Sequence, residues 1–252
     1  MIRIDDRTPN QLRPIEFEIG FSKYAEGSVL AKFGDTHVLC NATLDENLPR
    51  WLRNQPNQQG WVTAEYALLP RSTGRRVQRE QRWPKGRTQE ISRLIGRSLR
   101  MAVNLQALGP RQFIVDCDVL QADGGTRTAA VTGGWLALRL ALQPLIDSGE
   151  VEGQAAADIM RHQIAAVSVG IVDGTALLDL AYTEDVSAEV DLNLVMTAAG
   201  EVVEIQGTGE KAPFSMDRLH ELVDLAAGGI GQLINTQQAA LTEWLAREGF
   251  NK

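Results

Sequence analysis

Three aspartates stand six residues apart in the segment LLDLAYTEDVSAEVDLNLVM: Asp179, Asp185 and Asp191. Asp191 falls inside an apolar, strand-like stretch, where an unpaired carboxylate is costly unless it meets a cation or a metal ion. Carboxylate oxygens suit Mg²⁺, which typically binds one or two carboxylates together with phosphate oxygens. The alternative is a solvated turn around 183–187 with one strand carboxylate facing water, and spacing alone leaves both interpretations open.

A second candidate for chemistry is the turn in QADGGTRT, which we call the phosphate turn (123–127). Its two glycines let the backbone approach an anion closely, and the free N–H groups of a following helix point at that anion. Thr126 adds a hydroxyl donor, and the guanidinium of Arg127 can bind two oxygens of one phosphate. The pattern lacks the Gly-Lys-Ser/Thr of a P-loop and does not match the dinucleotide fingerprint. Many glycine-rich turns need only positive φ, so the turn alone is not specific.

The segment 71–100 has the opposite charge to the rest of the chain. It holds nine Arg and Lys85 against Glu80 and Glu90, so its net charge is +8 in a chain of −7, which leaves −15 for the other residues. Arginine suits phosphate because its planar guanidinium binds two oxygens at once and stays charged. The segregation therefore predicts a polyanion held at one place on an otherwise repulsive surface.

Composition sets the broad class. With 252 residues and 44% hydrophobic content, the chain can bury a substantial core, as one large domain or two small ones. We find no secretory signal in the first residues and no run approaching the roughly 20 apolar residues of a membrane span, so we expect a cytoplasmic protein without membrane contact. Cys40, Cys117 and three scattered histidines give no zinc spacing, which predicts two reduced core cysteines.

The elements that must position these residues begin with strands. Alternating apolar and polar residues over 15–44 predict an antiparallel meander, followed by a loop over 47–60 and a strand over 61–69. From Thr88, the expected N-cap, apolar residues recur at helical spacing, so half of the basic segment is expected to be helix and half extended loop.

The second half of the chain predicts a strand over 113–121 and a long apolar helix over 128–146, which puts the phosphate turn at a strand-to-helix junction. The further elements expected are a helix near 154–162, strands over 164–172, 176–180, 188–197 and 201–206, and helices over 215–234 and 236–248. Strands and helices are grouped rather than alternating, which indicates an α+β fold.

Seven blocks together make the chain similar to known proteins: EGSVLAKFGDTHVLC, GWVTAEYALLPRST, GRTQEISRLIGRSLR, DCDVLQADGGTRTA, AAVSVGIV, EDVSAEVDLNLVMT and VEIQGTGE. Over nearly its whole length the chain resembles the ribonuclease PH family of bacterial phosphorolytic exoribonucleases. The resemblance implies a fold related to ribosomal protein S5 domain 2, with mixed sheets packed with helices, as a single domain over 1–252. It implies a reaction in which inorganic phosphate attacks the last phosphodiester of an RNA 3′ end and releases a nucleoside diphosphate.

The resemblance also implies substrates and partners. The expected enzyme is a tRNA nucleotidyltransferase that removes nucleotides beyond the CCA end of tRNA precursors, with a reverse reaction that adds nucleotides and a further role in ribosomal RNA processing or degradation. The expected assembly is a homohexamer, a trimer of dimers, with the basic regions facing inward. A non-catalytic RNA-binding ring subunit and a plain RNA-binding module are the alternatives. Non-catalytic ring subunits lose the phosphate arginines or the aspartates, and both are retained here.

Family roles transfer to matching positions. The attacking phosphate is implied to bind at Arg87, Gly125, Thr126 and Arg127. A divalent ion, Mg²⁺ or Mn²⁺, is implied at Asp185 and Asp191, with Asp179 as a second-rank candidate, and the catalytic set is Asp185, Asp191 and Arg127. RNA-backbone contacts are implied at Arg71, Arg75, Arg76 and Arg79.

Two departures from the family pattern are visible. The family opens with Arg-x-x-Gly-Arg, whereas here Asp6 stands at the glycine position before Arg7. The stretch QRWPK (81–85) is shorter than the family's Lys- and Gly-rich loop. Neither departure involves the phosphate or metal positions.

Overall fold

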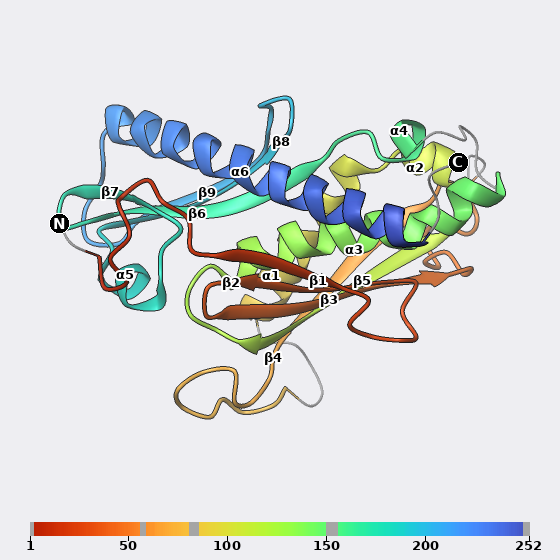
Figure 1. Ribbon diagram of the computed structural model, residues 1–252, viewed down its shortest axis with the longest axis horizontal. Coiled ribbons are helices and arrows are strands. Elements are labelled where there is room, and N and C mark those ends of the chain that lie inside the picture. Colours follow the sequence, from red (N-terminus) through yellow and green to blue (C-terminus); the bar gives the residue numbers. More distant parts are fainter. Residues whose placement is uncertain (1–2, 56–58, 81–85, 150–155, 249–252) are drawn as a thin grey trace.

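A computed structural model describes residues 3–55, 59–80, 86–149 and 156–248. In this part of the chain, two β-sheets pack with helices (Figure 1). In chain order the elements are β1 (Ile15–Ile19), β2 (Gly27–Phe33), β3 (Thr36–Asp45), β4 (Trp61–Leu68), α1 (Gly86–Ala102), α2 (Leu105–Leu108), β5 (Gln112–Gln121), α3 (Thr126–Ser148), α4 (Ala156–Ile159), β6 (Ile164–Val172), β7 (Thr175–Leu178), α5 (Tyr182–Ser187), β8 (Val190–Thr197), β9 (Val202–Gly209) and α6 (Met216–Glu248). The expected α+β class is confirmed.

The first sheet has the strand order β1-β2-β3-β5-β4. Its first three strands form the predicted antiparallel meander, and β4 adds to β5 in the parallel direction. Alternate residues of β3 are buried, as expected for a strand with one face on the core. Cys40 on β3 lies opposite Cys117 on β5, and both are buried, free thiols.

The second sheet has the order β7-β6-β8-β9 and is antiparallel throughout. All nine residues of β6 are buried, which explains why its sequence, IAAVSVGIV, is a continuous apolar run rather than an alternating one. Helix α3 packs on β2, β3 and β5 of the first sheet and on β6 of the second, so a single buried cluster joins the two sheets.

Helix α3 is long and apolar enough to cross a membrane by length and composition alone. Nearly all of it is buried in the protein, which is the pattern of a core helix. The helix also lies very close to β2: a Cβ on Gly27 would stand 1.9 Å from the Ala137 carbonyl oxygen. Glycine at position 27 therefore permits the contact between the first sheet and the core helix.

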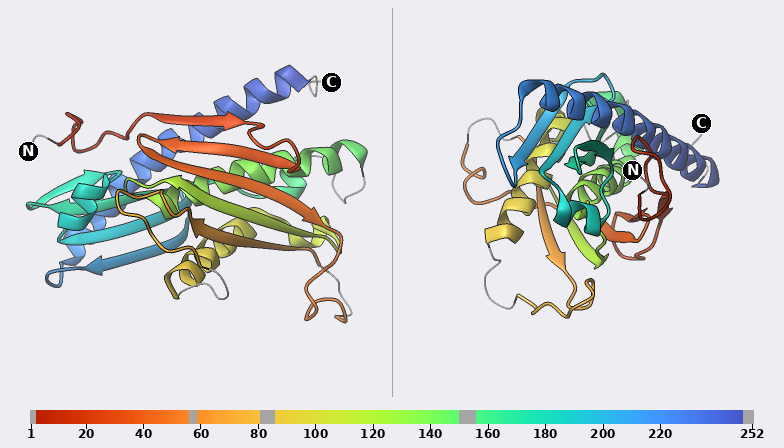
Figure 2. Two further views of the ribbon diagram at one scale, coloured as in Figure 1. Left: turned by 90° about the horizontal axis from the view of Figure 1, so that it is seen from below. Right: turned by 90° about the vertical axis from the view of Figure 1, so that its left-hand side faces the viewer.

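Several predicted element boundaries were wrong. The two helices expected after 215 are one helix, α6, about 50 Å long by helical rise, which extends along the molecule (Figures 1 and 2). Thr236, at the expected break, donates its hydroxyl hydrogen to the Gln232 carbonyl one turn earlier, so the helix continues through it. Helix α1 begins at Gly86, so Thr88 lies inside it and is not its N-cap.

The short helices were also misjudged. Helix α5 lies where the sequence suggested a solvated turn, because Glu184 accepts a hydrogen bond from the Ala181 amide and so caps its own first turn. Helix α4 covers only four residues of the helix expected near 154–162, and α2 was not expected.

The fold places two segments side by side that are distant in the sequence. The phosphate turn runs from the end of β5 into the first residues of α3. The segment 179–185, which we call the carboxylate arm, runs from the end of β7 into helix α5. A Cβ on Gly124 would stand 2.5 Å from the Leu180 carbonyl oxygen, so the backbones of turn and arm are in direct contact.

Candidate active site

The phosphate turn presents the N-terminus of α3. Gly124 and Gly125 have φ angles of 75° and 63°, which glycine adopts without strain. Gly125 is the N-cap residue and supplies no side-chain cap, and the first turn of α3 contains no acidic residue. The amides at the start of this long helix therefore form a site that favours an anion.

Thr126 is oriented by a residue that sequence reasoning missed. Its Oγ1 lies 2.8 Å from the hydroxyl of Tyr66 on β4. Burial raises the pKa of Tyr66, while the hydrogen bond with Thr126 and the positive charges of Arg87 and Arg127 act in the opposite direction. Both predicted phosphate arginines are thus close enough to act electrostatically on this tyrosine, which the block GWVTAEYALL contained without any signal of its role.

Arg127 is held by two further residues not predicted from the sequence. Its Nη1 donates to Oε1 of Gln206 on β9 at 3.0 Å and lies 3.4 Å from Oε1 of Glu90 on α1. Gln206 Nε2 donates to the same Glu90 oxygen at 3.0 Å. Arg127, Gln206 and Glu90 thus form a triangle in which each side chain contacts the other two, and this triangle fixes one edge of the Arg127 guanidinium.

An open pocket of about 450 Å³ lies beside this triangle. Its lining residues are Glu90, Arg127, Asp191, Asn193, Ile205, Gln206, Gly207 and Thr208. One cavity therefore receives both the predicted phosphate arginine and a predicted metal carboxylate.

Asp191 is electrostatically unusual. Burial, the neighbouring carboxylate of Asp185 and Glu210 raise its pKa to about 6, although the charge of Arg127 opposes the shift. Its Oδ2 receives only a 3.5 Å contact from Asn193 Nδ2, and its Oδ1 is buried without a hydrogen-bond partner among the described residues. A buried carboxylate oxygen without a partner calls for a proton or a cation.

Asp185 shares the same environment. Burial raises its pKa, and the charges of Arg127 and Arg87 act against that rise. The two aspartates thus lie near each other and near both phosphate arginines. Their donor set fits a divalent cation such as Mg²⁺, which binds hard oxygen ligands. Within the described residues no group of three or more Asp, Glu, His or Cys side chains is placed to hold an ion, so the remaining ligands would come from water and phosphate.

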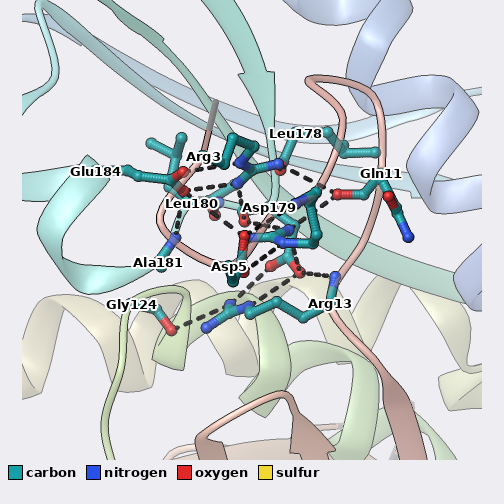
Figure 3. Close-up of polar contacts among 12 residues, drawn as sticks. Arg3, Asp5, Gln11, Arg13, Gly124, Leu178, Asp179, Leu180, Ala181 and Glu184 are labelled. Atoms are coloured by element: carbon teal, nitrogen blue, oxygen red, sulfur yellow. Dashed lines mark hydrogen bonds and ion pairs between the residues drawn. The ribbon is translucent and has the colours of Figure 1, made fainter. Parts of the chain in front are cut away.

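The suggested metal role of Asp179 does not fit its surroundings and is corrected here. Its Oδ2 accepts hydrogen bonds from the backbone amide and Nε of Arg13 at 2.8 and 3.0 Å, and its Oδ1 accepts one from Arg13 Nη2 at 2.7 Å (Figure 3). Arg7 Nη1 adds an ion pair at 3.6 Å. Because both oxygens already bind buried guanidinium groups, the charge of Asp179 is compensated without a metal ion.

The remaining predicted residues lie on the surface. Arg87, the second residue of α1, is exposed, and its charge acts on Asp185. The predicted RNA-contacting residues, all exposed in the segment after β4, are Arg71, Arg75, Arg76 and Arg79. Their role stays a prediction, and Lys85 and the loop 81–85 lie outside the described residues.

Two helical arginines of the basic segment, Arg97 and Arg100, have structural partners. Arg97 pairs with Glu204 on β9, and Arg100 donates to the Val62 carbonyl at 2.8 Å while it stacks over Trp61. These contacts tie α1 to its neighbouring strands, so part of the positive charge serves packing.

Solved structures with the same fold include a rice protein and two archaeal exosome structures. Rice (Oryza sativa) Rrp46 matches with a TM-score of 0.75 and 17% sequence identity, over 95% of this chain and 100% of that chain. The Archaeoglobus fulgidus exosome with RNA bound to the active site matches with a TM-score of 0.75 and 24% identity, over 92% and 91% of the two chains. An archaeal exosome core gives 0.74 and 23%, over 94% and 91%. These TM-scores show a shared fold, and at such low sequence identities the matches show nothing beyond the fold.

Family models match the sequence in two successive parts. Residues 11–144 match domain 1 of the 3′ exoribonuclease family, and residues 162–229 match domain 2. The first match contains the phosphate turn and the second contains both candidate metal aspartates. The chain therefore belongs to the 3′ exoribonuclease family of ribonuclease PH domains.

Proposed function

We propose that this protein is a phosphorolytic 3′-to-5′ exoribonuclease. The observation that carries the proposal is the single pocket lined by both Arg127 and Asp191. A reaction between inorganic phosphate and an RNA phosphodiester brings several negative charges together, and this pocket combines a guanidinium with a carboxylate suited to a cation.

The proposed reaction proceeds by in-line displacement. The amides that open α3, with Thr126, Arg127 and Arg87, hold the attacking phosphate. An oxygen of that phosphate forms a bond to the terminal phosphorus as the bond to the 3′ oxygen of the preceding nucleotide breaks. The products are a nucleoside diphosphate and an RNA shortened by one nucleotide, whose 3′ oxygen takes up a proton. Mg²⁺ or Mn²⁺ at Asp185 and Asp191 would neutralise charge that develops at the scissile phosphate.

The proposed substrates are tRNA precursors that carry nucleotides beyond the CCA end, with ribosomal RNA as a second class. The exposed arginines between β4 and the loop 81–85 support RNA binding, because arginine contacts to phosphates supply affinity that does not depend on sequence. A homohexameric ring with its basic segments facing inward, in the cytoplasm, completes the proposal. In such a ring the acidic remainder of the surface would direct RNA to the centre.

A non-catalytic RNA-binding ring subunit is the second candidate. The likeness to rice Rrp46 and to two archaeal exosome structures supports it, since one of the exosome structures has bound RNA and the other is an exosome core. Against it stands the retention of Arg127 and Asp191 in the lining of one pocket, with Asp185 close enough to raise the pKa of Asp191. A subunit that only binds RNA has no need of a buried aspartate oxygen that finds no hydrogen-bond partner in the described part of the chain.

One assay separates the two candidates. The purified protein is incubated with Mg²⁺ and a tRNA whose labelled 3′ tail extends beyond CCA, with and without inorganic phosphate, and the released nucleotides are identified. Phosphate-dependent release of nucleoside diphosphates is expected. RNA binding without release would establish the non-catalytic candidate, and phosphate-independent release of monophosphates would mean hydrolysis. A native mass measurement of the same preparation tests the hexamer.

A further inference from the structure

We propose that Arg13 is a positioning residue that, through Asp179, fixes the phosphate turn against the carboxylate arm and so sets the distance between the two halves of the active site. This inference rests on the proposed function, since it concerns the same site. It assigns a role to a residue outside the pocket, in the segment that leads into β1 (Figure 3).

Arg13 binds the carboxylate arm through Asp179. Three nitrogens of Arg13, including its backbone amide, donate to the two carboxylate oxygens of Asp179 at 2.7 to 3.0 Å. Asp179 has a φ of 54°, a conformation that is strained for a residue with a side chain and that persists when its surroundings hold it. The ion pair therefore determines how the arm leaves β7.

Arg13 also binds the phosphate turn. Its Nη1 donates to the Asp123 carbonyl at 2.5 Å, and its Nη2 lies 3.4 Å from the Gly124 carbonyl. A Cβ on Gly125 would stand 3.1 Å from the same Nη2, so the guanidinium lies directly against the turn. One side chain thus binds the turn and the arm at once.

Thr36 supports the turn but not the arm. Its Oγ1 donates to the Gly124 carbonyl at 2.7 Å and accepts from the Asp123 amide at 2.9 Å. Removing this hydroxyl takes both contacts from the phosphate turn. From Arg13 it takes only a 3.4 Å acceptor of Nη1, and the three bonds between Arg13 and Asp179 stay. Thr36 is therefore a tool for loosening chiefly the phosphate side of the site.

The arm is held at its other end by Arg3. Its Nε and Nη2 donate to the two carboxylate oxygens of Glu184 at 2.8 and 2.6 Å, and its Nη1 donates to the Leu178 carbonyl at 2.8 Å. Glu184 directly precedes Asp185. The N-terminal segment therefore secures the arm at both ends. Among the arginines drawn in Figure 3, only Arg13 also reaches the phosphate turn.

Arg13 acts through other residues and not on substrate. It is only 4% exposed, and its guanidinium is occupied by Asp179, Asp123, Gly124 and Thr36. Burial on its own would lower the pKa of Arg13, but the adjacent Asp179 raises it, so the charge is retained. Lysine would keep that charge but lacks the planar fork that reaches turn and arm together.

The test compares Arg13→Lys, Thr36→Val and a control, Arg139→Lys. Arg139 is also a buried arginine, but it bonds Gln143 within α3, more than three helical turns beyond the phosphate turn. For each variant we would measure the melting temperature, the phosphate and Mg²⁺ concentrations that give half-maximal rate, phosphate binding by thermal shift, and Mn²⁺ binding by electron paramagnetic resonance.

For Arg13→Lys we expect weaker phosphate and metal binding, each by about tenfold or more, which is typical for loss of a residue that orients a binding group. Thr36→Val should weaken phosphate binding and leave Mn²⁺ binding unchanged. Arg139→Lys should lower the melting temperature without changing either affinity.

Wild-type phosphate and metal affinities in Arg13→Lys, with a lowered melting temperature, would reduce the ion pair to a stability role and overturn the inference. If Arg13→Lys does not fold, Thr36→Val decides, and unchanged phosphate binding in that variant overturns it. The binding measurements need no turnover. A wild-type protein that binds phosphate and Mn²⁺ but releases no diphosphate would therefore refute the proposed function while the positioning role is still tested.

Discussion

Arg127 of α3 donates a 3.0 Å hydrogen bond to the side-chain oxygen of Gln206, which lies on strand β9 of the second sheet. This bond, with Glu90 alongside, holds the guanidinium where it lines the pocket that also contains Asp191. The orientation of Arg127, the candidate phosphate-binding arginine, is thus set by a residue nearly 80 positions later in the chain.

Gln206→Ala removes this acceptor. A hydrogen bond to a charged group is worth about 1.5–3 kcal/mol, so we expect at least a tenfold rise in the phosphate concentration for half-maximal rate. This concentration is measured by following the rate of nucleoside diphosphate release as inorganic phosphate is titrated. Gln238→Ala, which removes an exposed glutamine on α6, is the matched control and should saturate normally. Normal saturation in Gln206→Ala would mean that Arg127 does not depend on this bond.

Arg127→Ala should have a larger effect. Loss of one charge-assisted contact at a reaction centre of this kind costs ~3 kcal/mol, about a hundredfold in rate. We expect a steep rise in the phosphate requirement with tRNA binding preserved, because the exposed arginines after β4 are untouched. Phosphate titration and an RNA gel-shift assay would measure the two effects. Arg247→Ala, at the far end of α6, serves as control. An unchanged phosphate requirement would remove Arg127 from the phosphate site.

Asp185→Asn keeps the size of the side chain and removes its charge. We expect loss of turnover with an unchanged assembly, because a neutral amide binds a divalent cation weakly. Diphosphate release and native mass would be recorded together, with the exposed Asp224→Asn as control. Full activity of Asp185→Asn would exclude this residue from the catalytic set, and chelation of the metal in the wild type should reproduce the loss.

Asp191→Asn should stabilise the metal-free protein. The pKa of Asp191 is raised from 3.8 to about 6, chiefly by burial and then by Asp185, so its ionisation opposes folding. The penalty is absent below about pH 4, grows as pH rises, and reaches at most ~3 kcal/mol above about pH 6. The asparagine variant avoids the penalty, so its advantage in free energy of unfolding should grow over the same range.

Denaturant unfolding at pH 4 and pH 7, with and without Mg²⁺, measures this difference. Mg²⁺ should stabilise the wild type at pH 7 and reduce the advantage of the variant. An advantage of equal size at both pH values would show that the carboxylate of Asp191 does not titrate in this range.

Asp6 stands where the resemblance implies a glycine, and its φ of 60° is the left-handed conformation that glycine favours. The backbone therefore follows the glycine path despite the substitution. For an exposed residue in this conformation, Asp6→Gly should raise the free energy of unfolding by up to about 1 kcal/mol, and Asp6→Ala should lower it. Asp35→Gly is the control, because Asp35 is also an exposed aspartate but is not one of the non-glycine residues with positive φ. This change should lower the free energy of unfolding. Equal stability of the Gly and Ala variants at position 6 would contradict the argument.

Local sequence patterns were sufficient for most strands and for the class of fold. The alternating residues of β1 to β3 and the apolar run of β6 follow from which faces are buried, and these signals are local. Helix ends were less predictable. Helix α6 passes through Thr236 because the hydroxyl finds a partner inside the helix, and α5 forms because Glu184 caps it while bound to Arg3.

By itself, the sequence determined the family and the candidate residues for chemistry, because the glycine turn, the basic segment and the aspartates are short motifs that local composition makes visible. Only the tertiary structure distinguished the three evenly spaced aspartates. Asp179 meets Arg13, 166 residues earlier, and is neutralised, whereas Asp191 is left with a buried oxygen that has no partner among the described residues. The role of a carboxylate depends on which charges surround it in space. That property arises from contacts between distant segments and is not encoded in spacing along the chain.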